Sequence, residues 1–276
     1  MKLLGLAIVA VTGAFLIWAT GEFPDWGDPH SPASLHVSPR YIEKTLEETS
    51  VPNAVTSVLA DYRGYDTMFE TTVIFAAGVS CFILLRLFGK EEPDTVHYRH
   101  LLTGLTIRVR RKREGLEQLG EFERMDSVWT PHDLILRTLS RFLIPFIQLF
   151  ALYVIAHGHH SPGGGFQGGV ILGASLILMA ISQDMKSALD RLGERTLAML
   201  SAIGVSVYAG TGALCLVLGS NFLDYAALAE IFRVDPVEAR SLGIFLVEVG
   251  VGIAVMATMI LIYHNLASQG RLDEGL

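Results

Sequence analysis

"LILRTLSRFLIPFIQLFALYVIAHGHHSPGGGFQGGVILGASLILMAIS", residues 134–182, places two apolar runs on either side of a short stretch of histidine, proline and glycine. A bilayer core about 30 Å thick needs roughly 20 predominantly apolar residues per helix. Both runs are close to that length. We therefore predict two membrane helices that are joined by a polar turn.

The same pattern of apolar runs extends over the whole chain. Of its 276 residues 51% are hydrophobic and 18% are charged, which is apolar for a soluble protein. The runs are residues 3–19, 71–88, 134–156, 168–182, 197–219 and 242–263. Lys2 also makes the first run compatible with a secretory signal, but the residues around Ala19 form a poor cleavage site, so we favour a retained helix. We predict an all-α integral membrane protein with about six transmembrane helices, located in the cell membrane.

The basic residues indicate how these helices are oriented. Residues 89–133 contain eight lysines and arginines, whereas residues 20–70 contain three. The positive-inside rule places the first of these loops in the cytoplasm. Both termini then lie inside, and the polar turn at 157–169 lies outside. The cluster at 108–113, RVRRKR, is more readily explained as an ordinary topology determinant than as a site for anionic lipid or a partner protein.

The distribution of charge also divides the chain into parts. We predict a two-helix part at 1–90, a basic cytoplasmic linker at 91–124 and a four-helix part at 125–276. Within the outer loop, residues 38–60 show a helical period that Pro52 interrupts, which indicates a pair of short surface helices.

Glu248 is the carboxylate that stands deepest in an apolar run. A carboxylate at this depth costs at least ~2.5 kcal/mol, so we expect it to face other helices or a partner subunit and to bind and release a proton. The alternative is a protonated glutamic acid that hydrogen-bonds for helix packing.

Glu70 and Asp66 lie at the entrance of the second apolar run. Glu70 is placed to act as a titratable group at the mouth of an ion path. The alternative is a capping box, in which Thr67 caps the helix and Glu70 completes the motif. The residue pattern alone does not decide between these two roles.

The turn combines histidines with residues that break helices. We expect five turn residues to shape the backbone and to let helices approach closely. These residues are Pro162, Gly163, Gly164, Gly165 and Gly168. His157 and His159 can relay protons near neutral pH. Three of the glycines match G-x-G-x-x-G, but the preceding run is a membrane helix rather than a strand, which argues against a nucleotide site.

We expect no metal site and no bound redox cofactor. His159 and His160 are adjacent and diverge on a helix, and no carboxylate or thiol lies near them in the sequence. Cys81 and Cys215 fall in different apolar runs, so we predict no disulfide framework and no cysteine cluster.

The sequence resembles a known family over about residues 130–265. "GHHSPGGGFQGG" with its flanking runs and "LGIFLVEVGVGIAVMATMILIY" are similar to the MnhB/MrpB subunit of multisubunit sodium/proton antiporters. Residues 53–86 look like the C-terminal region of the large MrpA subunit, which occurs as a small separate subunit in membrane-bound hydrogenases. The acidic residues of the family map to Glu70, after YRGYDT where the family has FRGFDT, and to Glu248.

This resemblance implies a membrane subunit of an Mrp-type cation/proton antiporter, or of the antiporter-like module of a complex I-related hydrogenase. The transported ions would be H⁺ and possibly Na⁺. The partners would be other antiporter-type membrane subunits, membrane lipid and, in the second case, hydrogenase or iron–sulfur subunits; no nucleic acid is expected. The alternatives are a non-conducting scaffold that clamps its neighbours and a stand-alone transporter, which would show paired broken helices. An enzyme with its own active site is least favoured.

Overall fold

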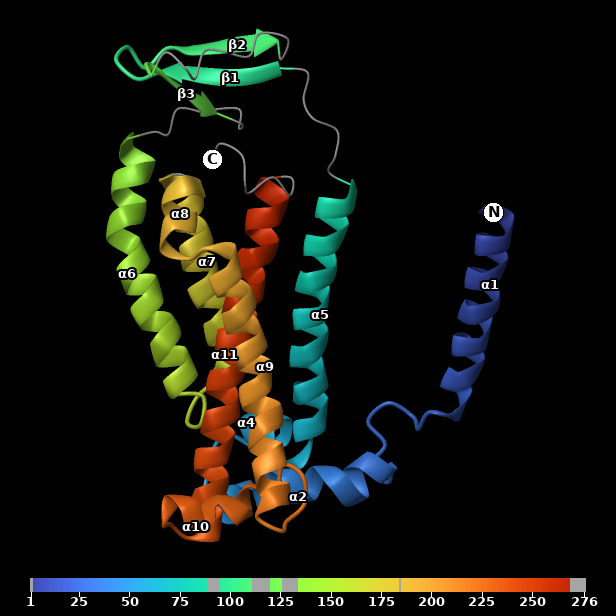
Figure 1. Ribbon diagram of the computed structural model, residues 1–276. Helices are drawn as coiled ribbons and strands as arrows, with labels where there is room; N and C mark the ends of the chain where they lie inside the picture. Colours follow the sequence, from blue (N-terminus) through green and yellow to red (C-terminus); the bar gives the residue numbers. More distant parts are fainter. Residues whose placement is uncertain (1, 89–94, 111–119, 126–133, 184, 269–276) are drawn as a thin grey trace. The chain divides into compact units, whose positions relative to one another are not determined.

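A computed structural model describes residues 2–88, 95–110, 120–125, 134–183 and 185–268 (Figure 1). Six of its helices are long and apolar enough to cross a membrane, as predicted. They are α1 (Lys2–Ala19), α5 (Gly64–Phe88), α6 (Leu134–Ala156), α7 (Gly165–Ser182), α9 (Glu194–Val217) and α11 (Pro236–Ala267). Shorter helices follow α7 and α9; they are α8 (Met185–Arg191), η5 (Tyr225–Leu228) and α10 (Ala229–Phe232).

Helix α11 is the centre of the bundle. It packs against α5, α7 and α9, and α7 in turn packs against α6 (Figure 1). About two thirds of the membrane-spanning part of α11 is buried inside the protein. The corresponding share is 11% for α5 and 22% for α6. A helix that is apolar on all sides is either buried in protein or exposed to lipid. In this chain α11 is the buried one, so Glu248 lies inside the protein.

Helix α5 begins earlier than its apolar run. It starts at Gly64, so Thr67 already lies inside the first turn. The Thr67 hydroxyl donates to the carbonyl of Leu59 at 2.7 Å instead of capping a helix. The capping-box explanation of Glu70 is therefore wrong, because both residues of the motif are one turn too far along the helix.

The segment before α5 forms several short helices rather than the expected pair. They are η2 (Ala33–Val37), α2 (Ser38–Glu43), α3 (Thr45–Thr49), α4 (Ala54–Ser57) and η3 (Val58–Tyr62); η1 (Thr20–Glu22) extends α1. Pro52 separates α3 from α4, as the sequence indicated.

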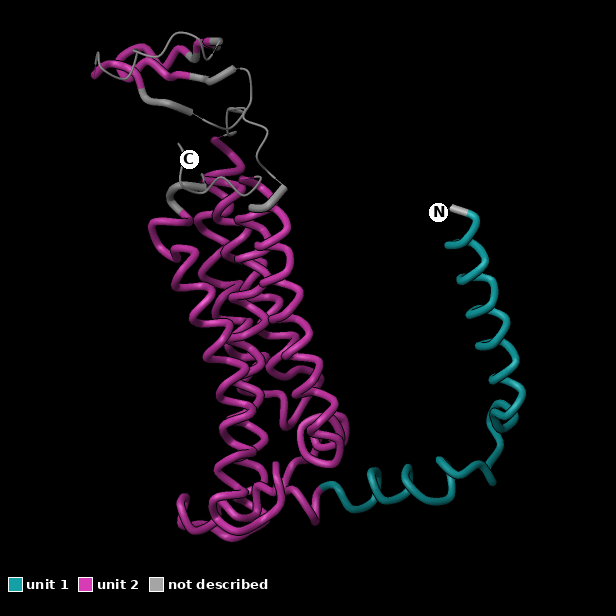
Figure 2. The backbone as a smooth tube through the Cα atoms, turned by 45° about the vertical axis from the view of Figure 1, so that its right-hand side comes forward, with its two compact units in different colours: residues 1–45 teal, residues 46–276 magenta. Residues whose placement is uncertain are grey.

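The chain divides into two compact units, residues 1–45 and 46–276 (Figure 2). Helix α5 thus shares a compact unit with the four C-terminal membrane helices.

The interval that we expected to be a linker contains a small sheet. Strands β1 (Thr95–His100), β2 (Thr106–Arg110) and β3 (Phe122–Met125) pair antiparallel in the order β2-β1-β3. Tyr98 stands opposite Ile107 on one side and Arg124 on the other. The alternation of β-branched, aromatic and basic residues in TVHYRH and TIRVR suits a strand, and the basic charge concealed this pattern. Of the RVRRKR cluster, residues 111–113 lie outside the described part of the chain.

Candidate ion site

Glu248 lies against the polar turn. Its side chain is almost entirely buried, and a Cβ atom on Gly164 would lie only 2.7 Å from its Oε1 atom. The Glu248 Oε2 atom has no hydrogen-bond partner among the described residues, and His159 Nε2 lies 3.8 Å from it, also without a partner. This distance is too long for a direct hydrogen bond, so the two atoms face each other across a short gap. The opposite nitrogen of the ring, Nδ1, lies 3.4 Å from the hydroxyl of Ser241.

The glycines of the turn allow this approach, together with Gly165 and Gly168, which we predicted in the turn but which lie at the start of α7. Gly164 has a φ of +132°, a backbone conformation that residues with a side chain rarely adopt. A Cβ atom on Gly165 would lie 1.9 Å from the carbonyl oxygen of Glu248, and one on Gly168 would lie 2.2 Å from Cγ1 of Ile155. A Cβ atom on Gly163 would lie 2.9 Å from the carbonyl oxygen of Val154. The turn therefore has to be glycine-rich for α7 to reach both α6 and α11.

Residues that lie about 100 positions earlier in the chain hold the turn in place. The side-chain amide of Asn53 donates to the carbonyls of Gly158 and Ser161, at 2.8 and 2.9 Å. The backbone N–H of Asn53 donates to the carbonyl of His159, and the hydroxyl of Thr56 donates to the carbonyl of Gly158. Asn53 also caps α4 through its Oδ1 atom. The segment before α5 thus fixes the position of His159 relative to Glu248.

Glu70 and Glu248 line the same cavity, which has a volume of about 170 Å³. Its polar lining consists of Thr56, Thr67, Glu70, Gln167, Tyr208 and Glu248. The remaining lining is apolar and comes from the segment before α5, from the turn, from α7 and from α11. Glu70 stands on an exposed face of α5, whereas Glu248 is buried. Two carboxyl groups, one exposed and one buried, therefore share one small space.

Two of the predicted residues lie elsewhere. The ring of His157 stacks on Tyr153 and His160, with centroids 4.9 and 5.5 Å away, and does not line the cavity. Asp66 pairs with Arg63 and is half exposed. Of the five residues predicted for an ion path, Glu70 and Glu248 line the cavity, and His159 lies next to Glu248 without lining it.

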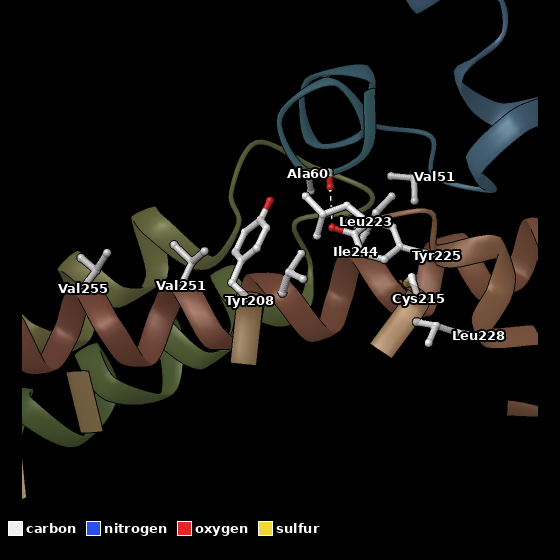
Figure 3. Packing of buried hydrophobic residues seen from close by; sticks show 11 residues of the cluster. Val51, Ala60, Tyr208, Cys215, Leu223, Tyr225, Leu228, Ile244, Val251 and Val255 are labelled. Carbon is white, nitrogen blue, oxygen red and sulfur yellow. Dashed lines mark hydrogen bonds between the residues drawn. The ribbon is translucent and has the colours of Figure 1, made fainter. Parts of the chain in front are cut away.

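A second polar cluster connects η3 to α9 and α11. Arg240 binds Asp61 at 2.8 Å and Asp224 at 3.1 Å. The hydroxyl of Tyr225 donates to the carbonyl of Ala60 (Figure 3). The hydroxyl of Tyr208 donates to the carbonyl of Gly64. These contacts fix the backbone of η3 and of the beginning of α5, which contribute the lining of the cavity around Ala60.

Burial shifts the pKa values of titratable groups outside the membrane spans, among them His159 and Asp61. Burial, and to a lesser extent the adjacent His160, lowers the pKa of His159, so its neutral form is favoured. Burial raises the pKa of Asp61, although the nearby Arg240 guanidinium opposes this effect. A neutral imidazole beside Glu248 can accept or donate a proton.

Sequence reasoning missed several residues of this site. Asn53, Tyr208 and Arg240 contact residues between 100 and 180 positions away, and no local pattern reports such contacts. Asn53, placed after Pro52 and before a helical segment, had the signature of an N-cap. Among the described residues, no group of three or more histidine, cysteine and acidic side chains is arranged to hold a metal ion.

Comparison with known proteins identifies relatives of both parts of the chain. Residues 135–261 match the family described as a domain related to the MnhB subunit of Na⁺/H⁺ antiporters, and residues 29–99 match MbhE, the family described as the E subunit of MBH. The B subunit of the Na⁺/H⁺ antiporter of Bacillus subtilis is 31% identical over 134 residues, which cover 46% of this chain and 93% of the relative. An uncharacterised protein of Methanocaldococcus jannaschii is 26% identical over 231 residues, 83% of this chain and 82% of the relative. A probable A/B subunit of a K⁺/H⁺ antiporter of Rhizobium meliloti is 26% identical over 235 residues, 83% of this chain but 22% of the relative.

Two solved structures share the fold. A chain of the membrane-bound sulfane sulfur reductase, an archaeal respiratory membrane complex, aligns with a TM-score of 0.60 at 24% identity, over 96% of this chain and 97% of that one. A chain of the Mrp complex from Dietzia sp. DQ12-45-1b aligns with a TM-score of 0.54 at 23% identity, over 99% of this chain and 26% of that one. The predicted resemblance is confirmed by these matches.

Proposed function

Because the chain belongs to the MnhB family through residues 135–261 and carries an MbhE domain at 29–99, we propose that it moves ions within a multisubunit membrane complex. The complex would be an Mrp-type cation/proton antiporter or the antiporter-like module of a related respiratory complex. Within it, Glu70, Glu248 and His159 would form an exchange site for H⁺, and for Na⁺ where the complex transports it. The shared cavity of Glu70 and Glu248 is the observation that carries this proposal.

The geometry supports a simple transfer at this site. A proton that enters the cavity binds to Glu248 Oε2, which lacks a hydrogen-bond partner among the described residues. The two side chains then close the 3.8 Å gap, and Glu248 Oε2 passes the proton to Nε2 of the neutral His159. The imidazole becomes an imidazolium, and the carboxylate is free to take another proton or a cation. Ser241 and the turn keep the imidazole in place during this exchange. Each step moves one proton and needs no redox cofactor.

The proposal includes an orientation and partners. Both termini and the interval 89–133 would face the cytoplasm, so the cavity would lie near the outer surface. The partners would be other antiporter-type membrane subunits and lipid, with iron–sulfur or hydrogenase subunits if the complex is redox-driven.

Transport in everted membrane vesicles tests the assignment of the site. The Glu248→Gln and Glu70→Gln variants are compared with Glu238→Gln, a matched change in the exposed first turn of α11. We expect the first two to lose most cation-dependent proton movement while the complex still assembles, and Glu238→Gln to retain it. Full transport by Glu248→Gln in an intact complex would reject the assignment.

One observation favours a second candidate, a scaffold that does not conduct. The Glu248 carboxyl group packs against Gly164 and Gly158, where added Cβ atoms would lie 2.7 and 3.3 Å from its oxygens, and a helix-packing glutamic acid would be placed in the same way. In that case Glu248→Gln keeps transport because glutamine preserves the size and an acceptor oxygen, whereas Glu248→Ala disrupts assembly.

A further inference from the structure

The cavity occupies one half of the bundle. On α11 the lining residues are Val247, Glu248 and Val251, and none lies on the C-terminal side of Val251. The rest of the lining comes from residues 55–70, from residues 163–167 and from Tyr208. The turn at 157–164 and the beginnings of α5 and α7 therefore surround the space, and Val251 marks its floor on α11.

On the C-terminal side of Glu248, the backbones of α7 and α9 come into contact with the backbone of α11. A Cβ atom on Gly169 of α7 would lie 2.7 Å from the carbonyl oxygen of Gly252. A Cβ atom on Gly204 of α9 would lie 2.5 Å from the carbonyl oxygen of Gly250 and 2.6 Å from the nitrogen of Ala254. Contacts this short leave no volume of roughly 10–15 Å³, the space that one water requires, between these backbones. Helices α7 and α9 thus close on α11 from two sides.

Helix α5 closes the third side. A Cβ atom on Gly78 would lie 2.6 Å from Cγ2 of Thr258, so α5 packs closely on α11 two turns beyond the floor. Between these contacts lie Ala254 and Val255, which are at most 1% exposed. Val251 and Val255 stand one turn apart on α11, and both belong to the same apolar cluster (Figure 3). An ion would have to leave its water to pass this layer, which is prohibitively costly.

We propose that the cavity is a vestibule that opens on one side only: water and hydrated monovalent cations reach Glu248 from the end of the bundle that carries the turn, and the layer formed by Gly169, Gly204 and Val255 stops them there. The chain alone then provides access to Glu248 but no passage across the bilayer. An ion at Glu248 leaves the cavity past Glu70, on the exposed face of α5. The nature of the ion rests on the proposed function, whereas the closure rests on the packing alone.

Two valines of α11 provide a matched test. In the assembled complex in sealed vesicles, the Val251→Cys and Val255→Cys variants are exposed to Ag⁺, a thiol-reactive monovalent cation, from one side and then from the other. Unreacted thiols are alkylated after denaturation and located by mass spectrometry, so native Cys81 and Cys215 can stay in place. A His160→Cys variant, exposed on the turn, identifies the side on which the cavity opens.

We expect Ag⁺ to protect Val251→Cys only from the side that protects His160→Cys, and to leave Val255→Cys fully alkylated from both sides. Protection of Val255→Cys from either side, protection of Val251→Cys from the opposite side, or no protection of Val251→Cys at all would overturn the proposal. If a valine variant does not assemble, Thr56→Cys in the cavity and Ala254→Cys in the layer replace the pair, with the same expected pattern.

The outcome is independent of the transport assay. If Glu248→Gln retains transport, the exchange site is rejected, but Ag⁺ still reports whether water reaches Val251. If Val255→Cys is protected while Glu248→Gln abolishes transport, the exchange site stands and the one-sided vestibule fails.

Discussion

Single residues carry the candidate site, and some of them stand out in the sequence. Glu248 was predictable because a carboxylate in the middle of an apolar run needs a buried partner or a function. His159 was predictable as a titratable group in the turn, but its position 3.8 Å from Glu248 was not. That position depends on Asn53 and Thr56, whose bonds span more than 100 residues of sequence.

Asn53 should be as important for stability as any residue of the turn. The Asn53→Ala variant loses the helix cap and two hydrogen bonds to turn carbonyls, so we expect a loss of about 2 kcal/mol. Thermal unfolding of the purified complex in detergent measures this loss. Asn221→Ala, at an exposed loop position, is the control and should change little. Equal stability of the two variants would show that Asn53 does not hold the turn.

His159 should make stability depend on pH. Burial lowers its pKa, so the folded protein binds this proton less tightly than the unfolded chain, in which a histidine titrates near 6.5. Stability is therefore lost as the pH falls below about 6.5 towards the lowered value. An ionised carboxyl group on Glu248 would stabilise the protonated imidazole of His159 and so reduce this loss of stability. A neutral carboxyl group would not.

The His159→Gln variant should accordingly gain in melting temperature relative to the unsubstituted protein as the pH is lowered from about 8 to about 5, the range that brackets the ordinary histidine pKa. His36→Gln, in the exposed outer segment, is the matched control for the loss of a histidine. If the melting temperatures of His159→Gln and of the unsubstituted protein changed with pH in the same way, this would contradict a buried, neutral histidine.

At the scale of elements, apolar length predicted the membrane helices, because the bilayer dictates that length. Helix α6 matches its predicted range, whereas α5 and α11 extend beyond their apolar runs. These extensions contain polar residues such as Asp66 and Arg240, which bind other protein groups and so do not interrupt the helix. The strands at 95–125 were missed because basic side chains on short strands look like a solvated loop.

Glycines on one helix should differ sharply in their tolerance of a methyl group. On α9, a Cβ on Gly204 meets the α11 backbone at 2.5 Å, whereas one on Gly210 meets nothing within 4 Å. We expect Gly204→Ala to destabilise the protein by about 1–3 kcal/mol or more through overpacking. Gly210→Ala should be neutral or stabilise by up to ~1 kcal/mol through helix propensity. Thermal unfolding compares the two variants, and equal stability would contradict the close packing of α9 on α11.

At the scale of the whole molecule, the sequence predicted a membrane protein of the antiporter family, and the comparisons confirm this. The predicted boundaries at 90 and 125 remain predictions about the two family segments. The packing follows another division, in which α5 joins the four C-terminal membrane helices. Hydrogen bonds from Asn53, Tyr208 and Tyr225 connect the two family segments, and such contacts are not visible in composition or periodicity.

The proposed orientation can be tested with two exposed positions. We expect a membrane-impermeant maleimide to label Ala33→Cys in intact cells and Thr103→Cys only in everted vesicles. The unsubstituted protein controls for reaction at the native cysteines. The reverse labelling pattern would place the turn and the cavity on the cytoplasmic side.

Glu248 should exchange protons with water through the cavity. Dicyclohexylcarbodiimide, which modifies protonated carboxyl groups in apolar surroundings, tests this directly when its adduct is located by mass spectrometry over a range of pH. We predict an adduct on Glu248 at low pH that declines as the pH rises, with none in the Glu248→Gln variant. An adduct yield that is independent of pH, or no adduct at any pH, would contradict an exchangeable proton at this site.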